Sequence, residues 1–280
     1  MITHAGAVDL TVDAVLLLGR MVGIDEFPSV LWLEPNVFFP DDQDRVDAVV
    51  LRQLTEAGIV GDDGRTHPRI ALWLRSLDRP DMEIAVDVYD LDRHRELTDM
   101  LRLTLVRCDD THVLATRCGD QIVLQELVGI GDDPATALAD TISAAMGAAE
   151  PAAFAPFTIA EITMAAVTID DAREAHRELR RHGAGTAQAD TLARSRCELR
   201  RWAAVTMIEH HDGGSVTAPG GIAVYDAPVG RIATAPSLGP DGTVYDTYTP
   251  GAPADIARAC RALLQLLPAG SWTETSRRDM

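Results

Sequence analysis

The chain has no lysine: its 25 basic side chains are all arginine, and 43 acidic side chains outnumber them. The formal net charge is −18. An acidic surface repels phosphate backbones, so nucleic-acid binding would require a local arginine stripe. The arginines between residues 177 and 201 are interleaved with Asp and Glu, which is typical of a solvated helix face with ion pairs. We therefore expect no nucleic-acid partner.

Cysteine is also scarce, and long apolar runs are missing. The four cysteines, Cys108, Cys118, Cys197 and Cys260, form no CxxC pair and are too few to cross-link a chain of 280 residues. No apolar run approaches the roughly 20 residues that cross a bilayer, and the first residues lack the basic start of a secretory signal. These absences predict reduced thiols, no transmembrane segment and a cytoplasmic location.

Catalytic motifs are missing as well: the sequence has no HExxH, no GxSxG and no phosphate-binding loop with its lysine. His210 and His211 are neighbours on a predicted strand, so they point to opposite faces and are expected to be solvated near a turn. Cys108 could pair with His112 as nucleophile and base, but a hairpin turn explains this segment better. We expect no catalytic residues, no metal and no cofactor, and hence no enzyme.

Helical periodicity predicts three helices in the first 80 residues. They run from Thr11, a candidate N-cap, to Gly23; from Asp41, another candidate N-cap, to Gly58; and from Pro68 to Pro80. Further helices are expected over 158–168, 170–182 and 186–197. The two prolines in 148–157 make that segment the best connection between two halves.

Alternation of apolar and polar residues predicts two sets of strands separated by turn residues. The first set covers 82–89, 101–107, 112–117 and 122–127, and the second covers 202–209, 222–225, 231–235 and 244–248. A helix follows each set, and the two helices share one spacing of apolar residues: Leu138, Ile142, Ala145 and Met146 in the first, Ile256, Cys260, Leu263 and Leu264 in the second.

The expected fold is therefore α+β, a mixed α/β protein with a central antiparallel β-sheet, two helical bundles and two pseudo-symmetric halves. Residues 1–150 form the N-terminal half, with helices and an antiparallel meander. Residues 151–280 form the C-terminal half, with a helical bundle, a meander and a terminal helix. Together they are expected to make one compact domain, with the halves sharing one sheet or packing two sheets together.

Several short motifs occur together in a recognisable order. They are Leu10-Thr11-Val12-Asp13-Ala14-Val15, Phe27-Pro28, Gly230-Arg231-Ile232, Thr249-Pro250-Gly251-Ala252-Pro253 and Leu267-Pro268-Ala269-Gly270-Ser271-Trp272. In this order, and with this succession of helices and strands, the chain resembles the EspG family of mycobacterial type VII (ESX) secretion chaperones over nearly its whole length.

The resemblance implies a cytosolic, ESX-specific chaperone that binds the exposed apolar tip of PPE in a PE–PPE heterodimer. It would keep that dimer soluble and direct it to the secretion apparatus. In the family, the tip is held between the central sheet, a loop joining two N-terminal strands and the C-terminal helical bundle. Here the loop would be residues 90–99 and the bundle would lie within residues 158–197.

The resemblance implies apolar and polar partner contacts in both regions. In the loop they would be Leu91, Arg93, His94, Arg95 and Leu97, and in the bundle Leu179, Leu192 and Arg194. Two alternatives remain: an enzyme or small-ligand-binding protein with a pocket between the halves, and a scaffold that self-associates, for instance as a homodimer, through an exposed edge strand.

Overall fold

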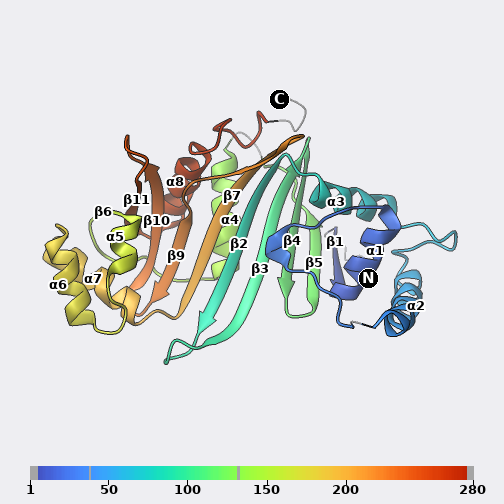
Figure 1. Cartoon of the computed structure of the whole chain (residues 1–280), viewed down its shortest axis with the longest axis horizontal. Helices are drawn as coiled ribbons and strands as arrows, with labels where there is room; N and C mark the ends of the chain where they lie inside the picture. Colours follow the sequence, from blue (N-terminus) through green and yellow to red (C-terminus); the bar gives the residue numbers. More distant parts are fainter. Residues whose placement is uncertain (1–5, 38, 131–132, 276–280) are drawn as a thin grey trace.

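A single antiparallel sheet of eleven strands organises the computed structural model, which describes residues 6–37, 39–130 and 133–275 (Figure 1). The N-terminal half supplies β1 (Ala7–Thr11), β2 (Met82–Leu91), β3 (Leu97–Cys108), β4 (Thr111–Cys118) and β5 (Gln121–Glu126). The C-terminal half supplies β6 (Phe157–Ala160), β7 (Arg201–His211), β8 (Gly214–Thr217), β9 (Ile222–Ala227), β10 (Gly230–Leu238) and β11 (Val244–Pro250). The two meanders therefore share one sheet.

The strand order shows the pseudo-symmetry directly: β1-β5-β4-β3-β2 continues as β7-β9-β10-β11-β6, with β8 paired to β7. Strands β2 and β7 meet at the centre and pair from Met82↔Glu209 to Asp90↔Arg201. On either side of this seam, each half repeats the same path from an outer strand through three helices and a meander to a closing helix. The expected two-half architecture is confirmed.

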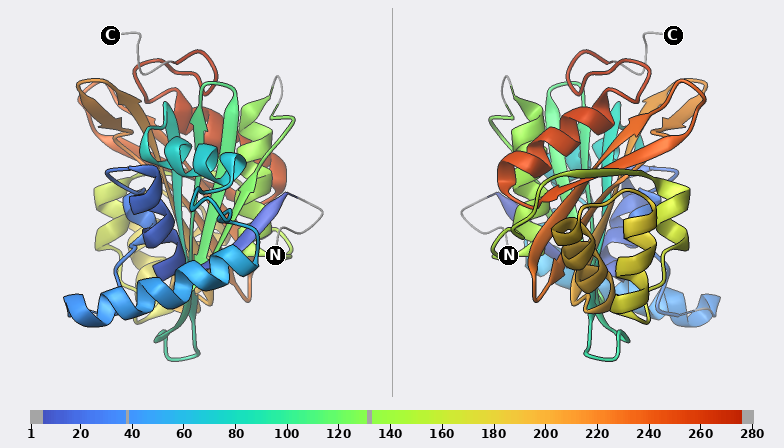
Figure 2. Two further views of the ribbon diagram at one scale, coloured as in Figure 1. Left: turned by 90° about the vertical axis from the view of Figure 1, so that its right-hand side faces the viewer. Right: turned by 90° about the vertical axis from the view of Figure 1, so that its left-hand side faces the viewer.

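The two closing helices, α4 (Pro134–Met146) and α8 (Pro253–Leu264), pack against each other on one face of the sheet (Figure 2). The apolar stripes predicted for them join one core with the inward side chains of β2, β3, β7 and β9. On β2, Ile84, Val86 and Val88 point into this core, because successive strand residues face opposite sides.

The opposite face carries a helical bundle at each end of the sheet (Figure 1). The N-terminal bundle contains α1 (Val12–Val22), the 3-10 turn η1 (Ser29–Leu31), α2 (Pro40–Glu56) and α3 (Pro68–Asp78). The C-terminal bundle contains α5 (Glu161–Ala166), α6 (Ala172–Arg181) and α7 (Thr186–Cys197). Each bundle has its own core over the strands beneath it.

Local signals explain most helix ends. The hydroxyl of Thr11 accepts a hydrogen bond from the amide of Ala14 at 3.2 Å, and Gly23 ends α1 with φ 69°, as expected. The predicted N-cap of α2 is wrong, because this helix begins at Pro40 and Asp41 lies within its first turn. Proline suits a first helical position, where its missing amide leaves no bond unmade.

Three strands were missed by the sequence patterns, namely β1, β6 and β8. Strand β6 occupies the start of the helix predicted over 158–168, so only Glu161–Ala166 is helical there. It has two buried side chains, Phe157 and Ile159, and a pattern of two positions cannot separate a strand from a helix turn. The 90–99 loop is also shorter than predicted, because β2 extends to Leu91 and β3 begins at Leu97.

Candidate functional site

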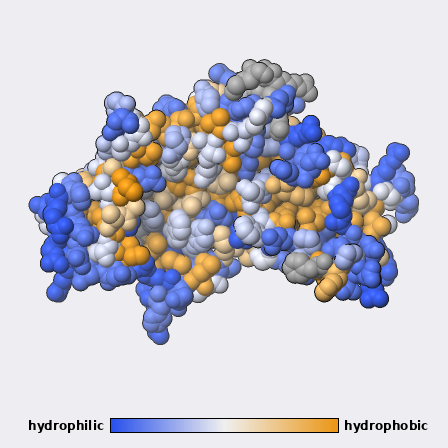
Figure 3. Space-filling model, viewed as in Figure 1, coloured by the Kyte–Doolittle hydropathy of each residue, from blue (hydrophilic) through white to orange (hydrophobic). Residues whose placement is uncertain are grey.

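The middle of the sheet is left uncovered on the face that carries the two bundles (Figure 1). We call this surface the central face and define it by Ala85, Asp87 and Tyr89 of β2, Trp202, Ala204 and Thr206 of β7, and Ala223 of β9. All of these residues are half-buried, while their neighbours along each strand point into the core under α4 and α8. Figure 3 shows apolar and near-neutral side chains across the middle of this view, between hydrophilic ends.

Aromatic and small side chains make the floor of the central face. Tyr89 and Trp202 are directly paired across β2 and β7, and their rings stack with centroids 4.6 Å apart and an interplanar angle of 15°. Asp87 lies 3.7 Å from Arg102, while burial raises the pKa of the Asp87 carboxyl and the Arg102 charge opposes that rise. The floor thus offers flat apolar area with few protruding side chains.

A pocket of about 320 Å³ opens where the C-terminal bundle meets the central face. We call it the α5 pocket, and its lining includes Glu161 and Met164 of α5, Arg196 of α7, Trp202 of β7, Tyr225 of β9, and Asp246 and Tyr248 of β11. The rings of Tyr225 and Tyr248 are nearly parallel, with centroids 6.5 Å apart. Thr234 of β10 also lines the cavity, so side chains from six elements converge on it.

The charges in the α5 pocket are unbalanced. Burial raises the pKa of Asp246 to about 6, and the negative charge of Glu161 adds to that rise. Burial also raises the pKa of both tyrosines, while Arg196 lowers it. Within the described ranges, no group forms a hydrogen bond or ion pair with the carboxylate of Asp246.

The β2–β3 turn, residues 92–96, is joined to the C-terminal bundle. Arg95 has a left-handed backbone at φ 65°, and its Nη1 donates to the carbonyl of Ile169 at 2.7 Å. The same guanidinium lies 3.6 Å from Asp170. Asp92 holds the turn by accepting from the amides of His94 and Glu96 at 2.7 and 2.9 Å, and these bonds lower its pKa. The turn and the bundle thus form one continuous rim.

Some of the predicted contact residues lie on this rim. Leu91 and Leu97 are opposite each other across the β2–β3 ladder, so they share a face, and Leu97 is 55% exposed. Arg93 and His94 are exposed at the turn, where Arg93 Nε donates to His94 Nε2 at 3.0 Å. These residues, together with Arg95, lie at or beside the β2–β3 turn, at the end of the β2–β3 ladder.

The three contact residues predicted in the C-terminal bundle differ in their exposure to solvent. Leu179 of α6 and Leu192 of α7 are 0% and 1% exposed and pack inside the bundle core, so they offer no surface to a partner. Helical periodicity marks such positions as apolar without distinguishing a core face from a binding face. Arg194 is exposed and lies 3.6 Å from Glu198 one turn later.

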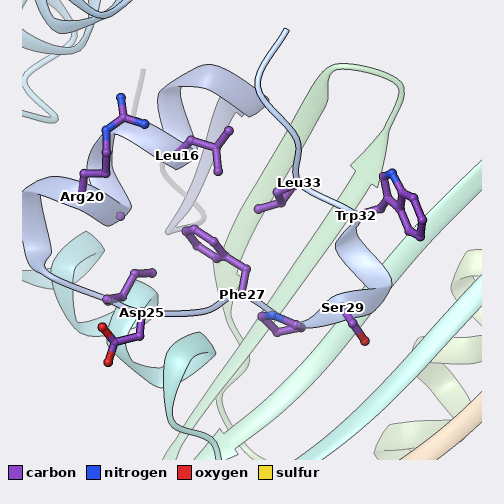
Figure 4. A pocket seen from close by; sticks show the side chains of 10 residues that line it. Leu16, Arg20, Asp25, Phe27, Ser29, Trp32 and Leu33 are labelled. Carbon is purple, nitrogen blue, oxygen red and sulfur yellow. The ribbon is translucent and has the colours of Figure 1, made fainter. Parts of the chain in front are cut away.

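Sequence patterns missed a second pocket, of about 410 Å³, in the N-terminal bundle (Figure 4). It is lined by α1 and by the segment that continues through η1 to Leu33. Trp32 is 61% exposed and adopts a left-handed backbone at φ 46°, which is rare for a bulky residue. Arg117 of β4 holds it there by donating to the carbonyls of Leu31 and Trp32. Figure 4 shows the Trp32 ring turned away from Phe27, over the strands.

The groups considered for catalysis do not converge. His112 is 8% exposed and pairs with Arg107 across the β3–β4 ladder, whereas Cys108 is the next residue after Arg107 and points to the opposite face. His112 Nε2 accepts from the indole of Trp272 at 3.2 Å. His210 was predicted to be solvated near a turn. This prediction is wrong, because its Nε2 lies 3.1 Å from the buried Glu83 carboxylate.

Two other features are absent from the part of the chain that the structure describes. No three His, Cys, Asp or Glu side chains there are grouped so that they could hold a metal ion. Among the same residues, no helix combines the length and the apolar character needed to cross a bilayer.

Comparison with known proteins gives a consistent result over nearly the full length. The EspG family model matches residues 11–262. The ESX-1 secretion-associated protein EspG1 of Mycobacterium tuberculosis is 30% identical over 268 residues, covering 95% of this chain and 89% of that protein. The ESX-3 secretion-associated protein EspG3 of Mycolicibacterium smegmatis is 30% identical over 277 residues, with coverage of 95% and 89%.

A solved structure shares the fold. It is the Mycobacterium tuberculosis type VII secretion system chaperone EspG5 in complex with a PE25–PPE41 dimer. Its TM-score is 0.79 at 21% sequence identity, and the match covers 96% of this chain and all of that one. The eleven-stranded sheet and its two bundles are therefore an architecture already seen in a secretion chaperone.

Proposed function

The chain belongs to the EspG family, and we propose that it is an ESX secretion chaperone that binds a PE–PPE heterodimer through the PPE subunit. Two kinds of support meet here: relatives of two ESX systems match at the same identity, and a chaperone with this fold is known in complex with a PE–PPE dimer. Binding would keep the apolar tip of PPE soluble until it reaches the secretion apparatus.

The observation that carries the proposal is the continuity of the central face, the α5 pocket and the β2–β3 turn. Hiding an apolar tip needs apolar anchors within a polar rim, since well-packed aromatic anchors dominate the energetics of protein interfaces. The stacked Tyr89 and Trp202 supply such an anchor, and the turn that Arg95 ties to the bundle supplies the rim. No chemical step is required of these residues.

We also propose the cellular setting and the domain organisation that this function requires. The chaperone would act in the cytoplasm, where its cargo is synthesised. Residues 1–150 and 151–280 would be two halves of one domain, an organisation supported by the long β2–β7 seam. Binding is proposed in preference to catalysis, because Cys108 and His112 face opposite sides of a hairpin.

Co-expression tests the proposal. The chain would be produced with each PE–PPE pair of the genome that encodes it, and with PE25–PPE41, and the complexes analysed by size-exclusion chromatography. At least one pair should elute with the chain and should be less soluble without it. If every pair elutes separately, the chain lacks the proposed cargo.

A variant at Leu97, the first residue of β3 beside the β2–β3 turn, tests the location of the interface. Leu97→Asp places a charge on the exposed apolar rim and should raise the Kd for the cargo at least about tenfold. Val128→Asp is the matched control, since Val128 is 83% exposed and follows β5. Equal affinities of the two variants would remove this turn from the interface.

A further inference from the structure

The α5 pocket has walls that suit a cation. Trp202, Tyr225 and Tyr248 line it with aromatic rings, whose electron-rich faces attract an ammonium or guanidinium group. An extended basic side chain also has an apolar stem that can lie along such rings. The walls alone would accept any flat apolar group, so the choice of ligand depends on the polar groups between them.

Those polar groups are two carboxylates for which the described residues provide no ion-pair partner. Asp246 faces the pocket from β11, Glu161 faces it from α5, and no basic side chain of the described residues lies within ion-pairing distance of either. Arg196 also lines the pocket, but its Nη2 donates to the carbonyl of Val167 at 3.2 Å and its charge acts on the two tyrosines. The pocket therefore lacks one positive charge near Asp246.

Other enclosed carboxylates of this protein have partners. Asp81 lies 3.1 Å from Arg107, Asp226 lies 2.6 Å from Arg231, and Glu209 accepts from the amide of Ala269 at 3.0 Å. A carboxylate held away from water without a partner is costly, because burial penalises the charged form. Asp246 is half-buried at the pocket wall and has no such partner among the described residues, so its carboxylate is open to a group that enters the pocket.

We propose that the α5 pocket takes one arginine or lysine side chain of the cargo, with Asp246 and Glu161 as its acceptors and the aromatic rings as its walls. This inference rests on the proposed function and names a recognition site within it. An anionic side chain would be repelled by the two carboxylates. A neutral apolar side chain would desolvate Asp246 further without pairing it, so the pocket selects against both.

Isothermal titration of the cargo pair found by co-expression tests the inference. Asp246→Asn keeps the shape of the side chain and removes its charge, and it should raise the Kd about tenfold or more, because one member of an enclosed charge pair is lost. Glu161→Gln should act in the same direction with a smaller effect, since Glu161 is exposed. Asp140→Asn is the control: it removes the same charge from the exposed side of α4, on the other face of the sheet, and should leave the Kd within about twofold.

The outcomes separate this inference from the proposed function. If wild-type protein binds a PE–PPE pair and Asp246→Asn binds it equally well or more tightly, the basic side chain is not the ligand, although the chaperone function stands. If wild-type protein binds no pair, the proposed function itself fails. A complementary change in the cargo completes the test: replacing the arginine or lysine that occupies the pocket with glutamine should weaken binding to wild-type protein and have less effect on Asp246→Asn.

Discussion

The two helical bundles lie at equivalent ends of a pseudo-symmetric sheet but close over it differently. In the N-terminal bundle, η1 contacts β2, β3 and β4, and the core contains large side chains such as Trp73, Leu74 and Ile70. The C-terminal core is rich in alanine, including Ala175, Ala184, Ala189 and Ala193. Its first helix, α5, has six residues against eleven in α1.

The two halves also differ in whether a partly buried carboxylate has a partner. In the N-terminal half, Glu126 accepts from Arg69 Nε and Nη2 at 3.2 and 3.1 Å and from the indole of Trp73 at 3.3 Å. Asp246 of the C-terminal half has no such partner among the residues that the structure describes. The same architecture is therefore built twice with different packing: both bundles have a pocket, but the N-terminal core holds the larger side chains and the α5 pocket holds a carboxylate that no described residue pairs.

The largest expected change in the free energy of unfolding comes from replacing one large side chain in each bundle core with alanine. Trp73→Ala should lower the free energy of unfolding by about 3–5 kcal/mol, and Leu192→Ala by about 2–3 kcal/mol, because less volume is lost and the short helices around Leu192 can close part of the cavity. Urea denaturation followed by circular dichroism measures both. A larger loss for Leu192→Ala would reverse the comparison.

The next largest change in stability is expected at Glu126, the partnered carboxylate of the N-terminal half. Glu126→Gln should destabilise the protein by about 1–2 kcal/mol, because the ionised acceptor of three hydrogen bonds becomes neutral. The same denaturation experiment applies, with Asp140→Asn as a surface control. An unchanged midpoint would mean that this network contributes nothing to stability.

The substitution Asp246→Asn should stabilise the protein, in contrast to the destabilising substitutions above. The folded-state pKa of about 6 lies above the ordinary value, so the ionised carboxylate destabilises the fold above about pH 6, and this penalty disappears as pH falls to about 4. The variant should be more stable than wild type by about 1 kcal/mol at pH 7.5, after allowance for solvent screening, which raises Tm by about 2–4 °C.

Thermal unfolding at pH 7.5 and pH 4 measures this gain, which should shrink at the lower pH. The other titratable or charged groups that line the pocket are Glu161, Arg196, Tyr225 and Tyr248. Because the negative charge of Glu161 adds to the rise in the Asp246 pKa, the stability gained through Asp246→Asn should be smaller in a Glu161→Gln background. A destabilised Asp246→Asn protein would show that the carboxylate has a structural role, contrary to the inference.

The smallest effect is expected on the outer surface of the C-terminal bundle. Arg194→Ala removes an exposed ion pair with Glu198 and should change stability by less than about 0.5 kcal/mol. If Arg194 is a rim contact, cargo affinity should fall less than about tenfold, mainly through slower association at low salt. Stopped-flow association rates at two salt concentrations measure this, and an unchanged rate would exclude Arg194 from the interface.

Much of the fold was accessible from sequence because it is encoded locally. The helix over 186–197 and the strand cores were predicted from periodicity, and the paired stripes of α4 and α8 do meet in one core. Strands β1 and β6 were missed because each is short and has only two inward apolar residues. Their pairing is fixed by partners distant in the chain, β5 and β11.

The candidate site was predicted only in outline. Leu97 and the turn were predicted only through a family resemblance and stay a prediction, whereas the pocket around Asp246 joins α5 to β11 and leaves no local pattern. The left-handed Trp32 depends in the same way on Arg117, which reaches it from another strand. Sequence periodicity shows which side chains are apolar, but it cannot show which of them a second bundle leaves uncovered.

Site-specific photo-crosslinking within the co-expressed complex tests the central claim most directly. A benzophenone side chain would replace Leu97 at the start of β3, Ile162 on α5, or Val123 of β5, which points to the α4 side of the sheet. The account predicts crosslinks to the PPE subunit from positions 97 and 162 and none from position 123. Crosslinks from position 123 alone would place the cargo on the opposite face and contradict it.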